Sequence, residues 1–310
     1  MKPQAVKGPE IRPGMKIEEL VESFGSMGFQ ASNLWEAVQV IKRMRENKAT
    51  VFLAFTSNMV SSGLREIFAQ MLKLRIVDAV VTTVGSVEED LMKCSGDFLM
   101  GDFDMNDEEL HKKGINRIGN VLVSNKMYIG LEKALQPFFG QVYARQKETG
   151  KMLAPSEIIA MLGETVKDEN SMLYWASKNK IPMYCPAITD GAFGLQAFFF
   201  KQDHKDFGID VTADMAQLSS LTFKTKKTGA IILGGGVAKH HTIGANLLRG
   251  GLDYAVYVGT SDESDGSMSG ARTKEAVSWG KIKEGRDHVS VTGEATVVFP
   301  LIVACMVGSV

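Results

Sequence analysis

The chain has 310 residues, enough for one large domain or two ordinary ones. Its 35 Lys and Arg residues nearly balance its 36 Asp and Glu residues, so the net charge of −1 lacks the basic excess of a typical nucleic-acid-binding protein. A hydrophobic content of 45% excludes a disordered chain and predicts a large core.

The cysteines and the two terminal segments indicate in which cellular compartment the protein is expected. Cys94, Cys185 and Cys305 show no CxxC spacing, which argues against a disulfide framework and a cysteine zinc site. The N-terminus has no apolar run of the signal-peptide type. The most apolar segment, 295–310, has 16 residues, fewer than the roughly 20 that span a bilayer, and contains Pro300. We therefore expect a buried helix there and a soluble, cytoplasmic protein without a membrane partner.

The first elements in chain order are helical. Residues 1–14 are polar and contain several Pro and Gly residues, which predicts an N-terminal arm before a single domain over 15–310. Apolar side chains recur at helical spacing over 17–24 and again over 34–44. The second of these predicted helices has Asn33 as a candidate cap, with Glu36 three residues later.

Strand-like runs follow, mostly separated by helical patterns. Strand, short Gly/Ser/Thr loop and helix in alternation predict an α/β fold, a single Rossmann-like domain whose mainly parallel sheet is flanked by helices. Ligands bind such sheets beyond the carboxyl ends of the strands. The runs are TVFLAF (50–55), IVDAVVTT (76–83), IPMYCP (181–186), AIILGGG (230–236) and DYAVYV (253–258).

Small polar residues close each of these runs, and their backbone N–H groups suit phosphate binding next to helix N-termini. The GxGxxG fingerprint is absent, so the residues alone leave two alternatives, a nucleotide crevice and plain βα turns. The turns are Ser57-Asn58, Thr83-Val84-Gly85, Thr189-Asp190-Gly191, Gly234-Gly235-Gly236 and Thr260-Ser261.

Two charged clusters follow glycine turns. Lys239-His240-His241 opens the helix after the triple glycine, as a proton-transfer group or as caps and packing residues. The histidines are adjacent rather than four apart and no HExxH occurs, so no metal is expected. Glu88-Glu89-Asp90 is interpreted either as acidic charge at a helix N-terminus or as a pocket for a cationic ligand.

The segment EAVSWGKIK (275–283) surrounds Lys281 with apolar residues. An amine in an apolar pocket loses hydration, which favours the neutral, nucleophilic form needed for a Schiff base. Trp279 could present its ring to a cationic amine. The alternative for Lys281 is an exposed lysine at a strand end.

Long strings of this sequence resemble the deoxyhypusine synthase family. They span about residues 5–305 in family order, and the short N-terminal arm is similar to that of archaeal members. The matching strings are GFQASN (28–33), TSNMVSSGLRE (56–66), VTTVGSVEEDLMK (81–93), GINRIGN (114–120), PAITDGAFG (186–194), IILGGGVAKHH (231–241), DYAVYV (253–258), SGARTKEAVSWGKIK (269–283) and ATVVFPLIVA (295–304).

The resemblance implies an NAD-dependent aminobutyl transferase. In that chemistry NAD takes hydride from spermidine, 1,3-diaminopropane leaves, and the aminobutyl group passes through an enzyme lysine to a lysine of translation initiation factor five A. The resemblance makes Lys281 the covalent carrier and His240 the proton-transfer residue. It further implies a homotetramer built from dimers, with the sites at the dimer interface.

The resemblance also assigns binding residues. The NAD contacts it implies are Ser57, Asn58, Ser61, Thr83, Gly85, Asp190, Gly235, Thr260, Ser261, Glu294 and Ala295, with Glu294 standing where the family often has Asp. The polyamine pocket it implies contains Glu88, Glu89, Gly266, Ser267, Glu275 and Trp279.

Three positions depart from the eukaryotic members of that family. Leu195 and Met268 stand in place of Asp, and Gly244 stands in place of Asn. Losing a carboxylate removes a charge-assisted hydrogen bond to an amine, so spermidine affinity falls unless other acids substitute.

Other functions therefore stay open. One is a homospermidine synthase-like enzyme with a small amine as acceptor, and another is an enzyme with a different amine donor, such as agmatine. A third, of another class, is an inactive relative that binds NAD or a partner, against which the joint presence of Lys281, His240 and Trp279 argues.

Overall fold

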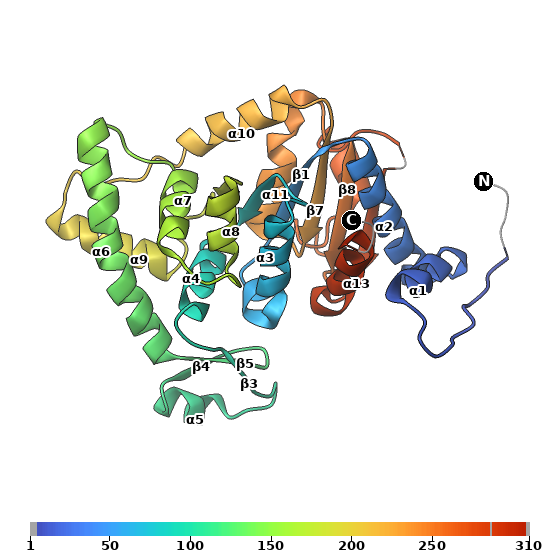
Figure 1. The fold of residues 1–310 in the computed structure, drawn as a ribbon, viewed down its shortest axis with the longest axis horizontal. Helices are drawn as coiled ribbons and strands as arrows, with labels where there is room; N and C mark the ends of the chain where they lie inside the picture. Colours follow the sequence, from blue (N-terminus) through green and yellow to red (C-terminus); the bar gives the residue numbers. More distant parts are fainter. Residues whose placement is uncertain (1–4, 286, 308–310) are drawn as a thin grey trace. The chain divides into compact units, whose positions relative to one another are not determined.

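The computed structural model describes residues 5–285 and 287–307 (Figure 1). The chain divides into two compact units, one formed by residues up to Phe55 and from Leu218 on, the other by Thr56–Gln217. Helix α10 (Ala213–Lys224) carries the chain from the second unit back into the first. Both units contain helices and parallel strands, which confirms the predicted α/β class.

The first unit is built on four parallel strands in the order β1-β7-β8-β9. They are β1 (Thr50–Phe55), β7 (Thr228–Leu233), β8 (Tyr254–Gly259) and β9 (His288–Thr292). Every residue of β7 is buried, as expected for a parallel strand covered on both faces. The predicted strands at 50–55, 230–236 and 253–258 are thus confirmed, whereas β9 was not predicted.

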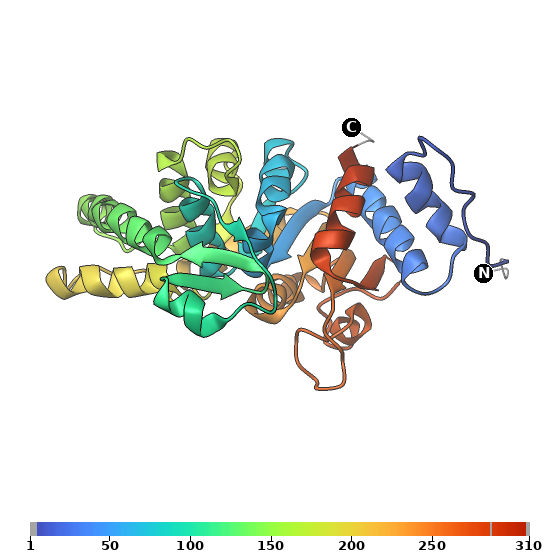
Figure 2. The same cartoon turned by 90° about the horizontal axis from the view of Figure 1, so that it is seen from below.

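Helices cover this sheet on both sides. α2 (Phe29–Glu46) packs on β8 and β9, and α13 (Ala295–Val307) lies along α2, while α11 (Gly236–Ala245) contacts β1 and β7 on the opposite side (Figures 1 and 2). The smaller helices of this unit are α1 (Ile17–Ser23), α12 (Thr273–Ser278) and the 3-10 turns Phe24–Ser26 and Leu247–Arg249.

The C-terminal segment forms the buried helix that the sequence predicts. Phe299, Ile302 and Cys305 on α13 are buried, and residues 308–310 of the predicted segment lie outside the described residues. Within the described ranges, no helix has both the length and the apolarity to cross a membrane. All three cysteines are free thiols.

The predicted cap of the second helix is wrong. Helix α2 begins at Phe29, with Gly28 before it, so Asn33 lies inside the helix rather than at its start. The first turn is held instead by the edge of β9. Asn33 donates to the carbonyl of Ser290 over 3.2 Å, and the N–H of Thr292 donates to Gln30 over 2.7 Å. These tertiary contacts extend the helix beyond its apolar stripe.

The second unit contains a parallel strand pair and a small antiparallel sheet. β2 (Ala79–Thr82) pairs with β6 (Met183–Tyr184), within the runs predicted at 76–83 and 181–186. The antiparallel sheet has the order β3-β5-β4, from β3 (Leu99–Met100), β4 (Ile115–Ile118) and β5 (Val121–Ser124). It was not predicted, although the Gly119-Asn120 pair between β4 and β5 is a known hairpin signal.

The remaining helices belong to this second unit. They are η2 (Val60–Leu64, a π-helical turn), α3 (Arg65–Lys73), α4 (Val84–Lys93), α5 (Asp107–Lys112), α6 (Asn125–Thr149), α7 (Pro155–Thr165), α8 (Met172–Asn179) and α9 (Ala192–Asp203).

Candidate active site

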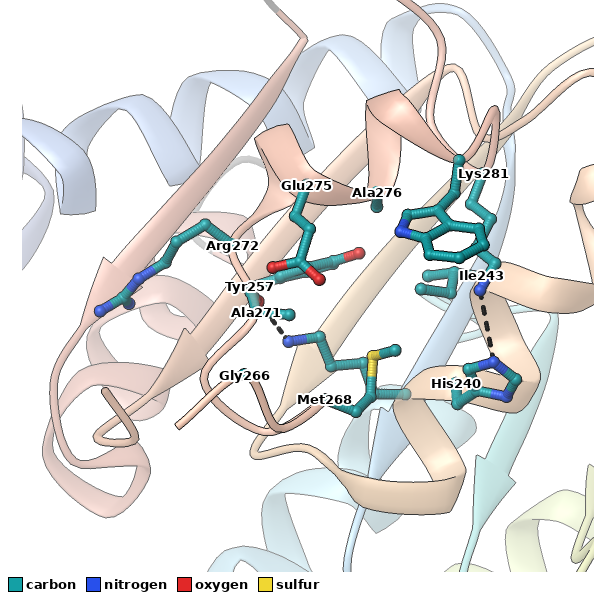
Figure 3. Close-up of a pocket in the computed structure, with 12 residues that line it drawn as sticks. His240, Ile243, Tyr257, Gly266, Met268, Ala271, Arg272, Glu275, Ala276 and Lys281 are labelled. Atoms are coloured by element: carbon teal, nitrogen blue, oxygen red, sulfur yellow. Dashed lines mark hydrogen bonds between the residues drawn. The ribbon is translucent and has the colours of Figure 1, made fainter. Parts of the chain in front are cut away.

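A cavity of about 290 Å³ lies in the first unit, between α11, the end of β8 and the segment that contains α12 (Figure 3). It brings together the two predicted catalytic side chains, Lys281 and His240. Its lining residues are Lys239, His240, Ile243, Tyr257, Gly266, Met268, Ala271, Arg272, Glu275, Ala276, Trp279 and Lys281.

The turn at the end of α12 directs Lys281 into this cavity. Gly280 adopts a left-handed φ of +66° and donates its N–H to Val277, while Lys281 donates its N–H to Ala276, each over 2.9 Å. This is the Schellman arrangement, which favours glycine because a side chain is strained at positive φ. The carbonyl of Lys281 then accepts from the N–H of Leu252 over 3.0 Å, so the lysine stands on a fixed backbone.

The Lys281 amine lies beside a histidine and an indole. Its Nζ is 3.3 Å from Nε2 of His240 and 5.3 Å from the centre of the Trp279 ring (Figure 3). Trp279 is 66% exposed, so its ring faces the open side of the cavity. A proton can pass directly between the lysine and histidine nitrogens at this separation.

Basic groups outnumber acidic ones in the wall of the cavity. Lys239, Arg272 and Lys281 face a single carboxylate, Glu275. A polycation entering this cavity would meet more repulsion than attraction from the walls of the first unit. Among the residues predicted for a polyamine pocket, Gly266, Glu275 and Trp279 line the cavity and Ser267 does not.

The strand ends of the first unit carry five of the predicted cofactor residues: Gly235, Thr260, Ser261, Glu294 and Ala295. The loop that contains Ser269 packs directly against the backbone of Gly235. A Cβ added at Gly235 would lie only 2.4 Å from the Cα of Ser269. Glu294 accepts from the N–H of Thr296 over 2.9 Å and so caps α13, which begins at Ala295.

The second unit gathers the other predicted cofactor residues near the start of α4. The N–H of Ser57 donates to Thr83 over 3.1 Å, and a Cβ on Gly85 would lie 2.8 Å from that of Ser57. Asn58 and Asp190 are exposed at the ends of their turns. The hydroxyl of Ser61 donates to Glu89 over 2.5 Å.

Glu88 and Glu89 are buried, and the interpretation of them as charge at a helix N-terminus is wrong. Helix α4 begins at Val84, four residues earlier, because Val84 and Gly85 continue directly into it from the strand turn. Burial raises the pKa of Glu89 to about 7, against the hydrogen bond from Ser61. Burial also raises the pKa of Glu88, which accepts the N–H of Phe193 over 2.6 Å. Burial thus favours the neutral form of both carboxyls, and at Glu89 the positive charge of Lys93 opposes this effect.

Within the described residues, no three His, Cys, Asp or Glu side chains lie close enough together to hold a metal ion.

Comparison with known proteins decides the family. The model of the family described as deoxyhypusine synthase matches residues 19–306. The chain belongs to the deoxyhypusine synthase family. Membership in this family implies a transferase.

The relatives cover nearly the whole chain. A probable deoxyhypusine synthase of Methanocaldococcus jannaschii is 44% identical over 97% of this chain and 96% of its own length. One of Schizosaccharomyces pombe is 44% identical over 94% of this chain and 87% of its own. The crystal structure of a protein from Entamoeba histolytica described as a deoxyhypusine synthase has a TM-score of 0.69 at 30% identity, over 97% of this chain and 96% of that chain.

A further structure shares the fold alone. The ternary complex of AgrE with ornithine and NAD+ has a TM-score of 0.57 at 12% identity, over 91% of this chain and 34% of that chain.

The three departures from eukaryotic deoxyhypusine synthases lie in different surroundings. Met268 lines the Lys281 cavity. Leu195 lies on α9 of the second unit and is 51% exposed. Gly244 lies on α11, where an added Cβ would meet no atom within 4 Å. Met268 is therefore the departure with a direct place in the cavity wall.

Three polar residues of the Lys281 cavity were not among the predicted site residues. They are Arg272, Tyr257 and Lys239, of which only Lys239 had been singled out, as part of the Lys239-His240-His241 cluster. Lys239 precedes His240, and Arg272 lies in the string at 269–283 that matches the family. The position of each in the sequence could therefore have indicated that it lies near the site. Tyr257 lies in the buried strand β8, and its apolar neighbours in the sequence make it indistinguishable from an ordinary core residue.

Proposed function

We propose that this protein is an NAD-dependent enzyme that transfers the aminobutyl group of spermidine to a lysine of translation initiation factor five A. The observation that carries the proposal is the Lys281 amine, 3.3 Å from His240 in a cavity that Trp279 borders. A nucleophilic lysine with an adjacent base is the arrangement that Schiff-base transfer needs. We further propose a cytoplasmic homotetramer, as the family resemblance implies.

The strand-end residues fit a dinucleotide in their chemistry. Hydroxyls at Ser57, Thr260 and Ser261 and carboxylates at Asp190 and Glu294 suit ribose and phosphate oxygens, together with the N–H groups of the glycine turns. Thr260, Ser261, Asp190 and Glu294 are exposed and open to a ligand. When bound, NAD would accept hydride from the carbon beside the secondary amine of spermidine and return it in the last step.

Lys281 then performs the exchange of amines. Its neutral Nζ attacks the carbon of the oxidised substrate's C=N bond, a new C–N bond forms, and the bond to 1,3-diaminopropane breaks. One proton leaves the lysine nitrogen and one reaches the departing amine, and His240 is placed to carry it. The lysine of the acceptor protein attacks the resulting imine in the same way and frees Lys281.

The carboxylates needed to hold the ammonium groups of spermidine come from two places in this proposal. Glu275 supplies one in the cavity wall, and Glu88 and Glu89 supply the buried pair of the second unit. An ammonium without an anionic partner is costly in a site that excludes water.

Met268 supports a second candidate function. An apolar side chain in the cavity wall suits an amine with fewer charges than spermidine. The second candidate is therefore transfer to a small amine such as putrescine, which makes homospermidine, or the use of another donor such as agmatine.

The test is to incubate the protein with NAD and labelled spermidine and to reduce the mixture with borohydride. We expect the aminobutyl mass on Lys281. Lys283, two residues on and paired with Asp253 over 2.6 Å, is the internal control and should stay unmodified. Label on another lysine, or no adduct with any polyamine, would contradict the proposal.

A second arm separates the two candidate functions. The same mixture without borohydride is given either the precursor of the initiation factor or putrescine. Label in the protein acceptor supports deoxyhypusine formation, and label in homospermidine alone supports the second candidate.

A further inference from the structure

Lys239 is a lysine in the interior of the first unit that the proposed chemistry does not use. It lies on α11 next to His240, yet only 2% of it is exposed, whereas His240 is open to solvent. Burying an ammonium is costly unless specific contacts compensate. Its contacts therefore indicate what the lysine does.

Two contacts hold the Lys239 ammonium. Its Nζ donates to the carbonyl of Ala271 over 2.5 Å and lies 4.4 Å from the centre of the Tyr257 ring. The hydroxyl of Tyr257 has no hydrogen-bond partner within the described residues, so the ring is the part of Tyr257 that serves the lysine. Two charged groups also act on Lys239: Glu275 favours its charged form, and Arg272 opposes it.

The carbonyl that Lys239 binds belongs to a loop, residues 261–272, that contains neither helix nor strand. The N–H groups of Gly270 and Ala271 both donate to Ser267, over 3.2 and 3.1 Å. Gly266, Met268 and Ala271 of this loop line the Lys281 cavity. The position of this loop therefore decides how wide the cavity is.

We propose that Lys239 is a positioning residue that fastens the loop at 266–271 to helix α11, and so sets the width of the cavity in which His240 and Lys281 act. One helix then carries both the proton-transfer histidine and the anchor of the opposite wall. The expected effect on amine binding in that cavity rests on the proposed function, whereas the anchoring of the loop does not.

The first test measures amide hydrogen exchange in the free protein. Lys239→Met keeps the length of the side chain and removes the ammonium. We expect exchange at Gly270 and Ala271 about tenfold faster, the effect of losing one charge-assisted hydrogen bond, with β7 unchanged. Lys274→Met, the same change at an exposed lysine of α12, is the matched control and should leave the loop unchanged. Equal exchange in Lys239→Met and the wild type would overturn the proposal.

A second pair of variants keeps the proposal falsifiable if Lys239→Met does not fold. Tyr257→Leu removes the ring below the ammonium, whereas Tyr257→Phe removes only the hydroxyl. Faster loop exchange in Tyr257→Leu but not in Tyr257→Phe supports the anchor. Equal exchange in both variants refutes it.

Kinetics then connect the anchor to the reaction. A loosened wall should raise KM for spermidine severalfold more than it lowers kcat, because the loop positions substrate and transition state alike. If the wild type turns over no polyamine, the proposed function fails while the exchange result still decides the anchor. If turnover is normal and the loop exchange does not change, the anchor alone fails.

Discussion

The Lys281 cavity of the first unit and the Glu88–Glu89 pair of the second unit are opposite in charge and in exposure. The cavity carries three basic side chains against one carboxylate, and its Trp279 is open to solvent. Glu88 and Glu89 are buried carboxyls with raised pKa values, and Glu89 is bonded to Ser61 rather than to a base. Basic side chains thus predominate in the first region and buried carboxyls in the second.

This difference matches two requirements of the proposed reaction, the covalent chemistry at Lys281 and the binding of the polyamine. A covalent lysine needs surroundings that keep its amine free of a carboxylate partner, since an ion pair would hold it as the ammonium. A polyamine needs carboxylates that hold its ammonium groups. Placing both sets of groups in one wall would let them neutralise each other. We therefore expect substitution of Lys281 to affect chemistry and substitution of Glu89 to affect substrate binding.

The largest effect is expected at Lys281. Lys281→Ala should abolish the borohydride-trapped adduct and lower kcat by about a thousandfold or more, because no other group can carry the aminobutyl chain. Mass spectrometry of the trapped protein and steady-state rates measure this. Lys283→Ala is the control and should keep most of the activity; a loss equal to that of Lys281→Ala would mean that the segment as a whole is disturbed.

Lys239 should make stability depend on pH. Burial lowers the pKa of this lysine to about 8, below the usual 10.5, although Glu275 acts in the other direction. The unfolded chain therefore binds more protons between these values, and the contribution of Lys239 to the free energy of unfolding should rise with pH from 8 to 10.5. Over this pH range the contribution of Lys239 to the free energy of unfolding should rise by an amount of the order of 3 kcal/mol.

Urea denaturation at several pH values measures this contribution as the difference between the wild type and Lys239→Met. Lys274→Met serves as the control for a lost surface charge. A difference between wild type and Lys239→Met that does not change with pH would show that Lys239 is not the titrating group.

Glu89 should make amine binding depend on pH in the range around pH 7. Because its pKa is raised to about 7, its carboxylate is lost as the pH falls through 7, and spermidine affinity should fall with it. Glu89→Gln should raise KM for spermidine about tenfold at pH 8 and flatten the pH dependence of KM. Glu66→Gln, at a half-buried acid of α3 that pairs with Arg65, is the control. An unaltered pH profile in Glu89→Gln would remove Glu89 from the polyamine site.

The smallest effect is expected where the cavity departs from the eukaryotic pattern. Met268→Asp adds a carboxylate to a wall with three basic groups and should lower KM for spermidine severalfold, with little change in kcat. Leu195→Asp repeats the change on α9. Putrescine and agmatine should gain less than spermidine from either change. Identical KM values for all three amines in wild type and variants would end the specificity argument based on these residues.

Much of the fold follows from local patterns. The apolar runs at 50–55, 230–236 and 253–258 form parallel strands because only a sheet covered on both faces buries such runs. The edge strand β9 was not predicted, although its valines alternate with polar residues in the pattern of a half-buried strand. Its polar side chains His288 and Ser290 are paired with Thr273, a contact that only the tertiary structure shows. The antiparallel strands β3 to β5 are too short for their pattern to stand out.

The sequence by itself determined the chemistry that is available: a lysine after a glycine turn, a histidine after a triple glycine, and paired acids after a strand. Only the tertiary structure brought Lys281 to His240, 41 positions earlier in the chain, and buried Lys239 against Ala271 and Tyr257. It also decided that Glu88 and Glu89 are buried instead of serving a helix end. The reason is physical: residue type sets which charges exist, but burial and the distance to a partner set how each one behaves, and both depend on packing between distant segments.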